Sequence, residues 1–215
     1  MYIPKLYREL DQEAIEYFIR ANDFATFISF DGERPIATHL LLELQGEGDT
    51  LFLNGHMARA NKQWKTFNPD QEVLAIFSGP HTYISPRWYN HVNVPTWNYL
   101  MIHVYGKPRL ITEHDELYAL LKRLVDKYEA DSGTIPAYRV ETLPEDFVER
   151  EIKAIAGFQI EVTRIEASFK LSQNRDEQDY DNIISELDER PDDGALGVAQ
   201  AMQQKRSKLF GAGYD

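Results

Sequence analysis

The chain contains no cysteine, and this absence removes several kinds of chemistry. Disulfide bonds, thiolate metal ligands and cysteine nucleophiles are all excluded. The sequence also lacks an apolar run approaching the roughly 18 residues that a membrane-spanning helix needs. Residues 1–5 do not have the anatomy of a signal peptide, so a cytoplasmic location is the expectation.

Positive charge is scarce. Lys and Arg total 23 against 35 Asp and Glu, which gives a net charge of −12. Proteins that wrap nucleic acid neutralise its phosphates with cations, so this balance argues against that class of protein. The basic stretch 203–208 is too short for a DNA-binding domain, and it leaves DNA as a partner only through a local patch.

Familiar catalytic and metal-binding motifs are missing as well. The six His residues show no H-E-x-x-H or comparable spacing, so the sequence predicts no metal site. The motifs G-x-S-x-G, G-x-x-x-x-G-K-[ST] and G-x-G-x-x-G are also absent. No residue is therefore assigned a catalytic role.

The composition is that of a globular chain, with 43% hydrophobic and 12% aromatic residues. Apolar patterning predicts short strands at residues 24–30, 35–44, 50–53, 73–77, 82–85, 97–111 and 158–165. Helical spacing predicts helices at 11–21 and 114–130. Thr142-x-x-Glu145 has the pattern of a capping box that opens a third helix through residue 155, and Gly157 is expected to break that helix.

Six or seven antiparallel strands at short spacing, with helices inserted between them, favour a closed barrel. A parallel sheet needs a crossover helix after almost every strand, and the first hairpin has no room for one. The predicted fold class is therefore mainly β with inserted helices (α+β), built on an antiparallel barrel.

The C-terminal segment differs in character, because residues 176–193 are rich in acidic side chains. Tyr180, Ile183, Ile184 and Leu187 would line one face of a helix there, and a second short helix is expected at 195–205. We therefore predict a barrel domain over residues 1–170. Residues 171–215 are predicted to form a helical extension that packs on the barrel or on a partner subunit.

Residues 54–64 form the most informative segment of the chain. A strand-like run precedes Gly55, and a short helical pattern that carries Arg59 and Lys62 follows it. Free N–H groups at a helix start favour a phosphate, and His56 and Asn61 would add donors around the same point. The alternative is a solvated helix start with ordinary surface cations, and spacing alone favours that alternative.

Five segments, taken in order, resemble the PaiB family, which is described as FMN-binding, split-barrel transcriptional regulators. These segments are residues 35–40, 55–61, 79–89, 94–99 and 170–175. The resemblance implies a six-stranded split barrel related to pyridoxamine phosphate oxidase and flavin reductases. It also implies a homodimer with FMN at the interface. In related oxidases an Arg-Lys pair grips the flavin phosphate, whereas Ala58-Arg59 stands at the similar place here, so one cation is missing.

The resemblance and the local chemistry together indicate which residues would contact the flavin. Thr38 falls on an otherwise apolar strand face and His39 on the other face, and both would reach the flavin ring or its ribityl hydroxyls from the barrel wall. A buried Thr that only satisfies a backbone group is the commoner case. The later segments add Ser85, Trp97, Lys170, Ser172, Gln173 and Arg175 as candidates, with a solvated loop as the alternative for residues 170–175.

Three functions remain open at this point. The first is an FMN-binding dimer that senses flavin or redox state and regulates transcription. This hypothesis rests on the family resemblance. The second is an FMN-dependent oxidoreductase, in which the protein orients a substrate against the cofactor. The third is a haem-binding split barrel with an axial His.

Overall fold

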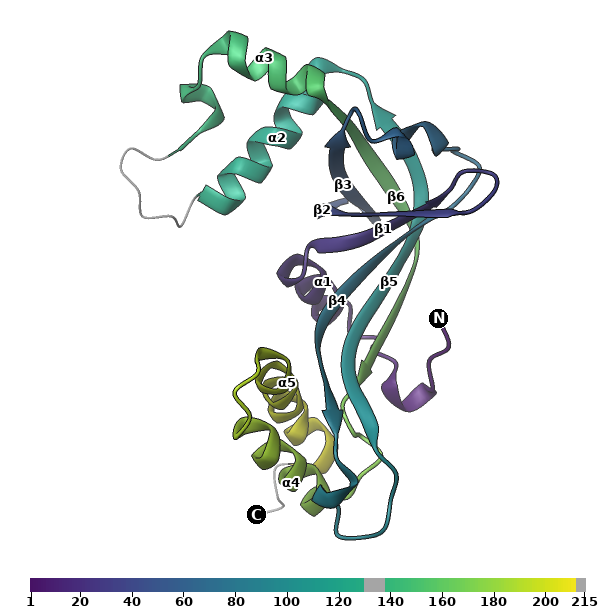
Figure 1. Cartoon of the computed structure of the whole chain (residues 1–215), viewed down its shortest axis with the longest axis vertical. Coiled ribbons are helices and arrows are strands. Elements are labelled where there is room, and N and C mark those ends of the chain that lie inside the picture. The colour runs from purple at the N-terminus through teal and green to yellow at the C-terminus, as the bar shows by residue number, and fades with distance from the viewer. Residues whose placement is uncertain (130–137, 212–215) are drawn as a thin grey trace. The chain divides into compact units, whose positions relative to one another are not determined.

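The computed structural model describes residues 1–129 and 138–211 (Figure 1). Six strands lie in these residues: β1 Phe24–Phe30, β2 Pro35–Glu47, β3 Thr50–Ala58, β4 Val73–Ile84, β5 Thr96–Ile111 and β6 Ile155–Lys170. The α-helices are α1 Gln12–Ala21, α2 His114–Glu129, α3 Glu145–Ala154, α4 Glu177–Asp188 and α5 Asp193–Phe210. Short 3-10 turns lie at Lys5–Tyr7, Lys62–Thr66, Pro86–Trp88 and Val140–Thr142. No helix in these two ranges is long and apolar enough to cross a membrane.

The six strands form a closed barrel in the order β1-β2-β3-β6-β5-β4. β1 pairs antiparallel with both β2 and β4, and β3 pairs antiparallel with β2 and β6. The β1–β2 turn is fixed by Asp31, whose Oδ1 accepts hydrogen bonds from the N–H groups of Glu33 and Arg34. Gly32 follows Asp31 with φ +99°, a conformation that costs little without a Cβ. The predicted antiparallel barrel with inserted helices is confirmed.

The chain divides into two compact units. The first unit comprises Met1–Phe18, Phe77–His103 and Glu166–Asp215, and the second comprises Ile19–Ile76 and Val104–Ile165. β4, β5 and β6 each contribute residues to both units. The division into a barrel over 1–170 and an extension over 171–215 stays a prediction.

The core of the second unit fills the barrel with apolar side chains. Phe27, Leu42, Leu53 and Phe158 have no exposed surface. The ring centroids of Phe27 and Phe158 are 5.2 Å apart, and Phe67 packs edge-on against Phe158 at 5.3 Å. Burying such side chains contributes roughly 1.5–3 kcal/mol each, so this interior is a main source of stability.

α2 and α3 cover one part of the second unit through a separate apolar cluster. Leu117, Leu120 and Leu124 of α2 pack with Ile152 of α3 and with Ile111 at the end of β5. Gly157 of β6 makes room for this layer, since a Cβ at this position would lie 2.3 Å from Cδ2 of Leu117. The expectation that Gly157 breaks a helix is therefore wrong, because β6 already begins at Ile155.

The predicted capping box is also wrong. α3 begins at Glu145, and its N-cap is Pro144, which has no side chain to cap the helix. The Thr142 hydroxyl instead donates to the carbonyl of Arg139 within the 3-10 turn Val140–Thr142. Three strand predictions also differ in extent. Residues 73–77 and 82–84 belong to one continuous strand, β4, and residues 50–53 are the start of a strand that runs to Ala58.

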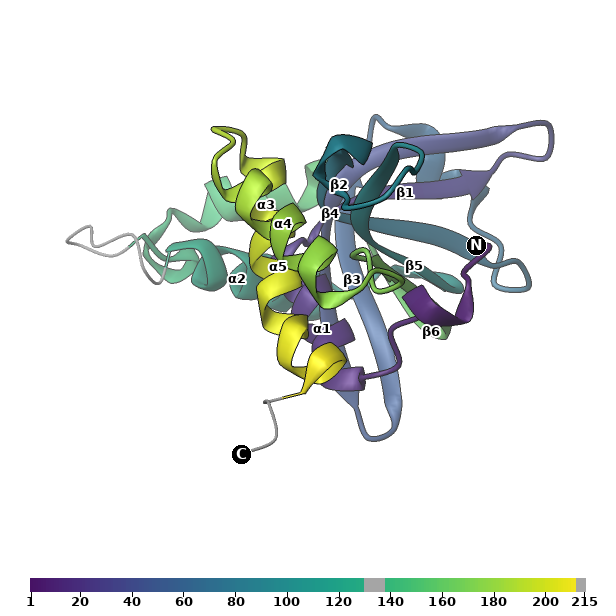
Figure 2. The ribbon, with the colours of Figure 1, turned by 90° about the horizontal axis from the view of Figure 1, so that it is seen from below.

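In the first unit, α4 and α5 lie side by side (Figures 1 and 2). The predicted face of α4 is buried, with Tyr180, Ile183, Ile184 and Leu187 all at most 8% exposed. Tyr180 donates a hydrogen bond of 3.0 Å from its hydroxyl to the carbonyl of Met202 in α5. Asp176 and Asp192 cap the two helices by accepting from the N–H groups of Asp179 and Ala195. α5 extends well beyond the predicted 195–205 at both ends.

Candidate functional site

The segment between β3 and β4 does not form the predicted anion-binding helix start. Residues Lys62–Thr66 form a single 3-10 turn, which is too short for a useful helix dipole. Arg59 precedes this turn, and Asn61 caps it by accepting a hydrogen bond from the N–H of Gln63 at 3.0 Å. Lys62 is exposed to solvent. Any anion bound here is therefore held by side chains rather than by the helix end.

A buried hydrogen-bond network connects this segment to β1 and β2. Gln63 is 2% exposed and accepts a hydrogen bond from the Thr38 hydroxyl through Oε1. Its Nε2 donates to Oγ of Ser29 at 3.2 Å and to the carbonyl of Ile36 at 3.1 Å. Nδ2 of Asn61 donates to the Thr38 hydroxyl at 3.0 Å. The network thus brings together two of the predicted flavin contacts, Thr38 and Asn61, but these polar atoms are bonded to the protein itself.

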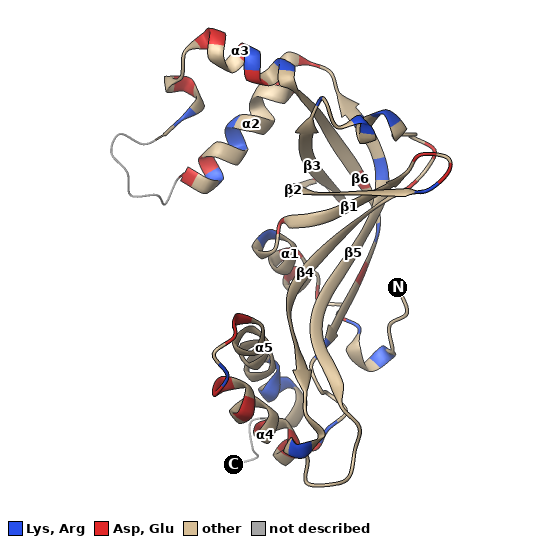
Figure 3. Ribbon diagram, viewed as in Figure 1, with Lys and Arg blue, Asp and Glu red and all other residues tan. Residues whose placement is uncertain are grey.

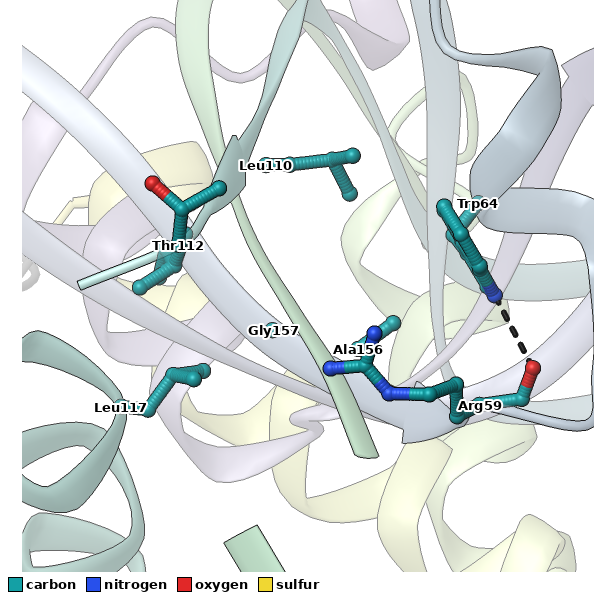
Figure 4. Close-up of a pocket in the computed structure, with 8 residues that line it drawn as sticks. Arg59, Trp64, Leu110, Thr112, Leu117, Ala156 and Gly157 are labelled. Carbon is teal, nitrogen blue, oxygen red and sulfur yellow. Dashed lines mark hydrogen bonds between the residues drawn. The ribbon is translucent and has the colours of Figure 1, made fainter. Parts of the chain in front are cut away.

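Arg59 lines a small cavity of about 190 Å³ (Figure 4). The other lining residues are Trp64, Leu110, Ile111, Thr112, Leu117, Ala156 and Gly157. Nε of Arg59 donates to the carbonyl of Lys153 at 3.0 Å, and Nε1 of Trp64 donates to the carbonyl of Arg59 at 3.1 Å. These bonds hold the backbone and the base of the guanidinium, while its terminal nitrogens have no partner among the residues that the structure describes.

The cavity has the chemistry to bind part of a flavin. A guanidinium with free N–H groups suits a phosphate, and an indole beside aliphatic side chains suits a flat ring. Pockets that enclose ligands of this size measure roughly 300–1,000 Å³. The 190 Å³ beside Arg59 is smaller, so this cavity alone holds only a portion of FMN.

His56 lies next to this cavity. It pairs across β3 and β6 with the cavity-lining Gly157, and paired residues of an antiparallel sheet point to the same side. Nδ1 of His56 is buried without a hydrogen-bond partner among the described residues. Burial lowers the pKa of His56, which favours the neutral imidazole. His39, by contrast, is exposed on β2 and contacts the Thr26 hydroxyl at 3.1 Å.

Two further candidates, Ser85 and Trp97, lie in the first unit. Oγ of Ser85 caps the turn Pro86–Trp88 by accepting from the N–H of Arg87 at 3.3 Å. Trp97 is 52% exposed, with its ring centroid 6.1 Å from that of His81 and 6.3 Å from that of Tyr83. Ser85 is therefore occupied locally, whereas Trp97 presents an open aromatic surface.

The remaining candidates form a tight turn after β6. Ser172 has φ +60° and exchanges hydrogen bonds with the buried side chain of Asn98, the shorter at 2.9 Å. Gln173 accepts from the N–H of Leu171 at 2.7 Å and donates to the carbonyl of Phe169. The N–H of Arg175 closes the turn on the carbonyl of Ser172. Ser172 and Gln173 thus build the turn, and Lys170 and Arg175 stand on either side of it.

Sequence reasoning missed several polar residues that organise these regions. Gln63 and Ser29 complete the network around Thr38, and Asn98 supports Ser172. A Gln in a short polar turn has the pattern of a surface residue, so the sequence around Gln63 does not indicate that its side chain is buried. The one available signal was Thr38, since a hydroxyl on an apolar strand face requires a hydrogen-bond partner.

Replacing Gln63 tests whether this network is structural. Gln63→Leu keeps the volume but removes the side-chain partner of the Thr38 and Ser29 hydroxyls and of the Ile36 carbonyl, so we expect a loss of about 1–3 kcal/mol in the free energy of unfolding. Urea denaturation measures it. Gln71→Leu, at an exposed position, is the matched control and should change little. Equal stability of the two variants would contradict the assignment.

Comparison with known proteins gives this architecture a family. Residues 1–164 match the family model described as "Putative FMN-binding domain". The chain is 41% identical over 208 residues to the Bacillus subtilis protein named "Protease synthase and sporulation protein PAI 2", covering 97% of this chain and 99% of that one. An uncharacterised protein of Emericella nidulans is 29% identical over 71% of this chain and 72% of its own length.

Solved structures support the same fold. The flavocytochrome Anf3 of Azotobacter vinelandii aligns with a TM-score of 0.57 and 18% identity, over 84% of this chain and 78% of that one. A conserved hypothetical protein of Mycobacterium tuberculosis aligns with a TM-score of 0.57 and 11% identity, over 82% and 94%. The expected flavin cofactor agrees with the family model, and the fold agrees with these structures. The chain belongs to the FMN-binding domain family that includes the B. subtilis PAI 2 protein.

Proposed function

We propose that this protein is an FMN-binding regulator of gene expression that acts as a homodimer. The observation that carries the proposal is the 41% identity to the B. subtilis protein over almost the whole of both chains. The name of that protein refers to protease synthesis and to sporulation. The family model supplies the cofactor, FMN.

The cavity beside Arg59 is the proposed phosphate end of the flavin site. Arg59 would bind the phosphate through its terminal nitrogens, and Trp64 with Leu110 would contact the flavin. His56, with its buried and partnerless Nδ1, would supply a neutral hydrogen-bonding group beside it. Thr38 and Asn61 would act as positioning residues, because they fix the turn that follows Arg59 through Gln63. Bound FMN supplies the redox chemistry.

A second copy of the chain would complete the site. The cavity beside Arg59 is too small to enclose FMN, so the rest of the cofactor needs further cover. Trp97 and Tyr83 are 52% and 40% exposed, and large aromatic side chains are enriched in subunit interfaces. We propose that this aromatic surface is part of the homodimer contact. His39, Lys62 and Ser85 are proposed to lie near the cofactor only in the assembled dimer.

Replacing Arg59 tests the phosphate assignment. Arg59→Ala should weaken FMN binding about 10–100-fold, the effect of losing a charge-assisted hydrogen bond, while riboflavin affinity stays unchanged. Fluorescence titration with both flavins makes the measurement. Arg150→Ala is the control, since its side chain is 64% exposed on α3. The phosphate assignment fails if Arg59→Ala and Arg150→Ala bind FMN equally well.

Two experiments, one in cells and one with the purified protein, distinguish regulation from catalysis. Deleting the chromosomal copy should change the abundance of specific transcripts. The wild-type protein should restore them and Arg59→Ala should not. In parallel, the purified FMN-loaded protein should oxidise NADH or NADPH no faster than free FMN. Saturable NAD(P)H turnover with unchanged transcripts would identify an oxidoreductase instead, and a Soret band after haem titration would identify a haem protein.

A further inference from the structure

Two cations near the end of β6 have no acidic partner. Nζ of Lys170 donates to the hydroxyl of Thr96, and Nε of Arg175 is buried without a hydrogen-bond partner. No Asp or Glu among the described residues forms an ion pair with either side chain. The chain has 35 acidic residues for 23 basic ones, and the basic residues of α5, Lys205, Arg206 and Lys208, each form an ion pair with an acidic residue (Figure 3). Lys170 and Arg175 are therefore two part-buried cations without a counter-charge among the described residues.

Tyrosines surround this pair. The guanidinium carbon of Arg175 lies 4.4 Å from the ring centroid of Tyr89, and Nζ of Lys170 lies 5.9 Å from that of Tyr7. Tyr89 is 8% exposed, yet its hydroxyl has no hydrogen-bond partner in the part of the chain that the structure describes. A buried hydroxyl without a partner costs about 1–3 kcal/mol, so native proteins normally supply a partner.

The electrostatics indicate that these groups share one environment. Burial lowers the pKa of Lys170, and the neighbouring charge of Arg175 lowers it further. Burial raises the pKa of Tyr7, while the charge of Arg175 opposes that rise and Tyr99 and Tyr89 add to it. Burial and the charge of Arg175 both disfavour the protonated ammonium of Lys170, and a bound anion would offset them.

The turn that carries Arg175 is built to hold it in place. Ser172 adopts φ +60°, a conformation that is uncommon for a residue other than glycine. The buried Asn98 and the side chain of Gln173 hold the turn through hydrogen bonds. A local cost of about 1–3 kcal/mol persists only where the surroundings impose it, and such positions cluster at ligand sites. The backbone that carries Arg175 is thereby fixed.

We propose that Lys170 and Arg175, together with the hydroxyl of Tyr89, form a binding site for an oxyanion, either a phosphate group or a carboxylate. The guanidinium offers two donors in a plane, the ammonium offers a point charge, and the Tyr89 hydroxyl donates the last hydrogen bond. The ring of Tyr89 also lines an open hollow of about 480 Å³ formed with residues 86–93. This hollow gives the organic part of a ligand space next to the anion.

The oxyanion has two sources with the same chemistry. It is either a free small molecule or the phosphate of FMN itself, and the second source rests on the proposed function. The assignment of the site does not depend on which source supplies the group.

In the first arm of the test, the full-length protein is titrated with inorganic phosphate and binding is measured by calorimetry. Arg175→Gln and Lys170→Gln should each weaken binding about tenfold or more, and Tyr89→Phe about threefold to tenfold. Tyr89→Phe removes only the hydroxyl, so it keeps the ring under Arg175 and guards against a folding defect. Arg34→Gln, with a side chain 80% exposed, is the control and should bind as the wild type does.

Titration with FMN and with riboflavin is the second arm. If the flavin phosphate is the ligand, Arg175→Gln loses the preference for FMN over riboflavin and phosphate competes with FMN. If a free anion is the ligand, FMN affinity is unchanged in Arg175→Gln and phosphate binds the FMN-loaded protein as tightly as the free protein. Either result supports the site.

The proposal is overturned if all three variants match Arg34→Gln both in phosphate affinity and in the ratio of FMN to riboflavin affinity. With normal FMN binding, that outcome leaves the proposed function intact. Conversely, phosphate binding that depends on Arg175 in a protein that binds no flavin would support the oxyanion site and contradict the proposed function.

Discussion

The packed interior of the barrel is the constraint on which the rest of the structure depends. Phe27, Leu42, Leu53 and Phe158 are fully buried there, and Phe67 adds a third ring to its aromatic cluster. Because large side chains pack in this interior, we propose that a flavin binds on the outside of the barrel. Phe67 also anchors the segment that begins at Arg59, which couples the proposed phosphate contact to the core.

Two polar arrangements in this chain differ in a way that separates structural from ligand-binding roles. Around Gln63 every polar atom of the side chain has a partner within the protein, and the network fixes the backbone. Around Arg175 the turn itself is fully bonded, but the guanidinium and the Tyr89 hydroxyl that it presents are not. Buried polar groups in native proteins nearly always have a hydrogen-bond partner. The unsatisfied groups around Arg175, unlike those of Gln63, are therefore the basis for assigning that arrangement to a ligand.

The sequence predicted the barrel because strand alternation and turn residues are local signals, and the apolar face of α4 because its 3.6-residue period is equally local. It failed where tertiary packing decides. Gly157 looks like a helix breaker in sequence, but its role is the close approach of Leu117. Gln63 carries no local sequence signal, since its partners Thr38 and Ser29 lie on β2 and β1. The pattern around Arg59 predicted an anion site at a helix start, but the expected helix is only the 3-10 turn Lys62–Thr66, and the role of Arg59 stays a prediction.

The central claim is that this chain binds FMN on the outside of a filled barrel, at a site that two copies complete. Sedimentation of the purified protein with excess FMN, monitored by flavin absorbance, tests it most directly. The account predicts about one FMN per chain, moving with a species of twice the chain mass. Tight FMN binding by a monomer would contradict the shared site, and absence of flavin from the sedimenting protein would contradict FMN binding itself.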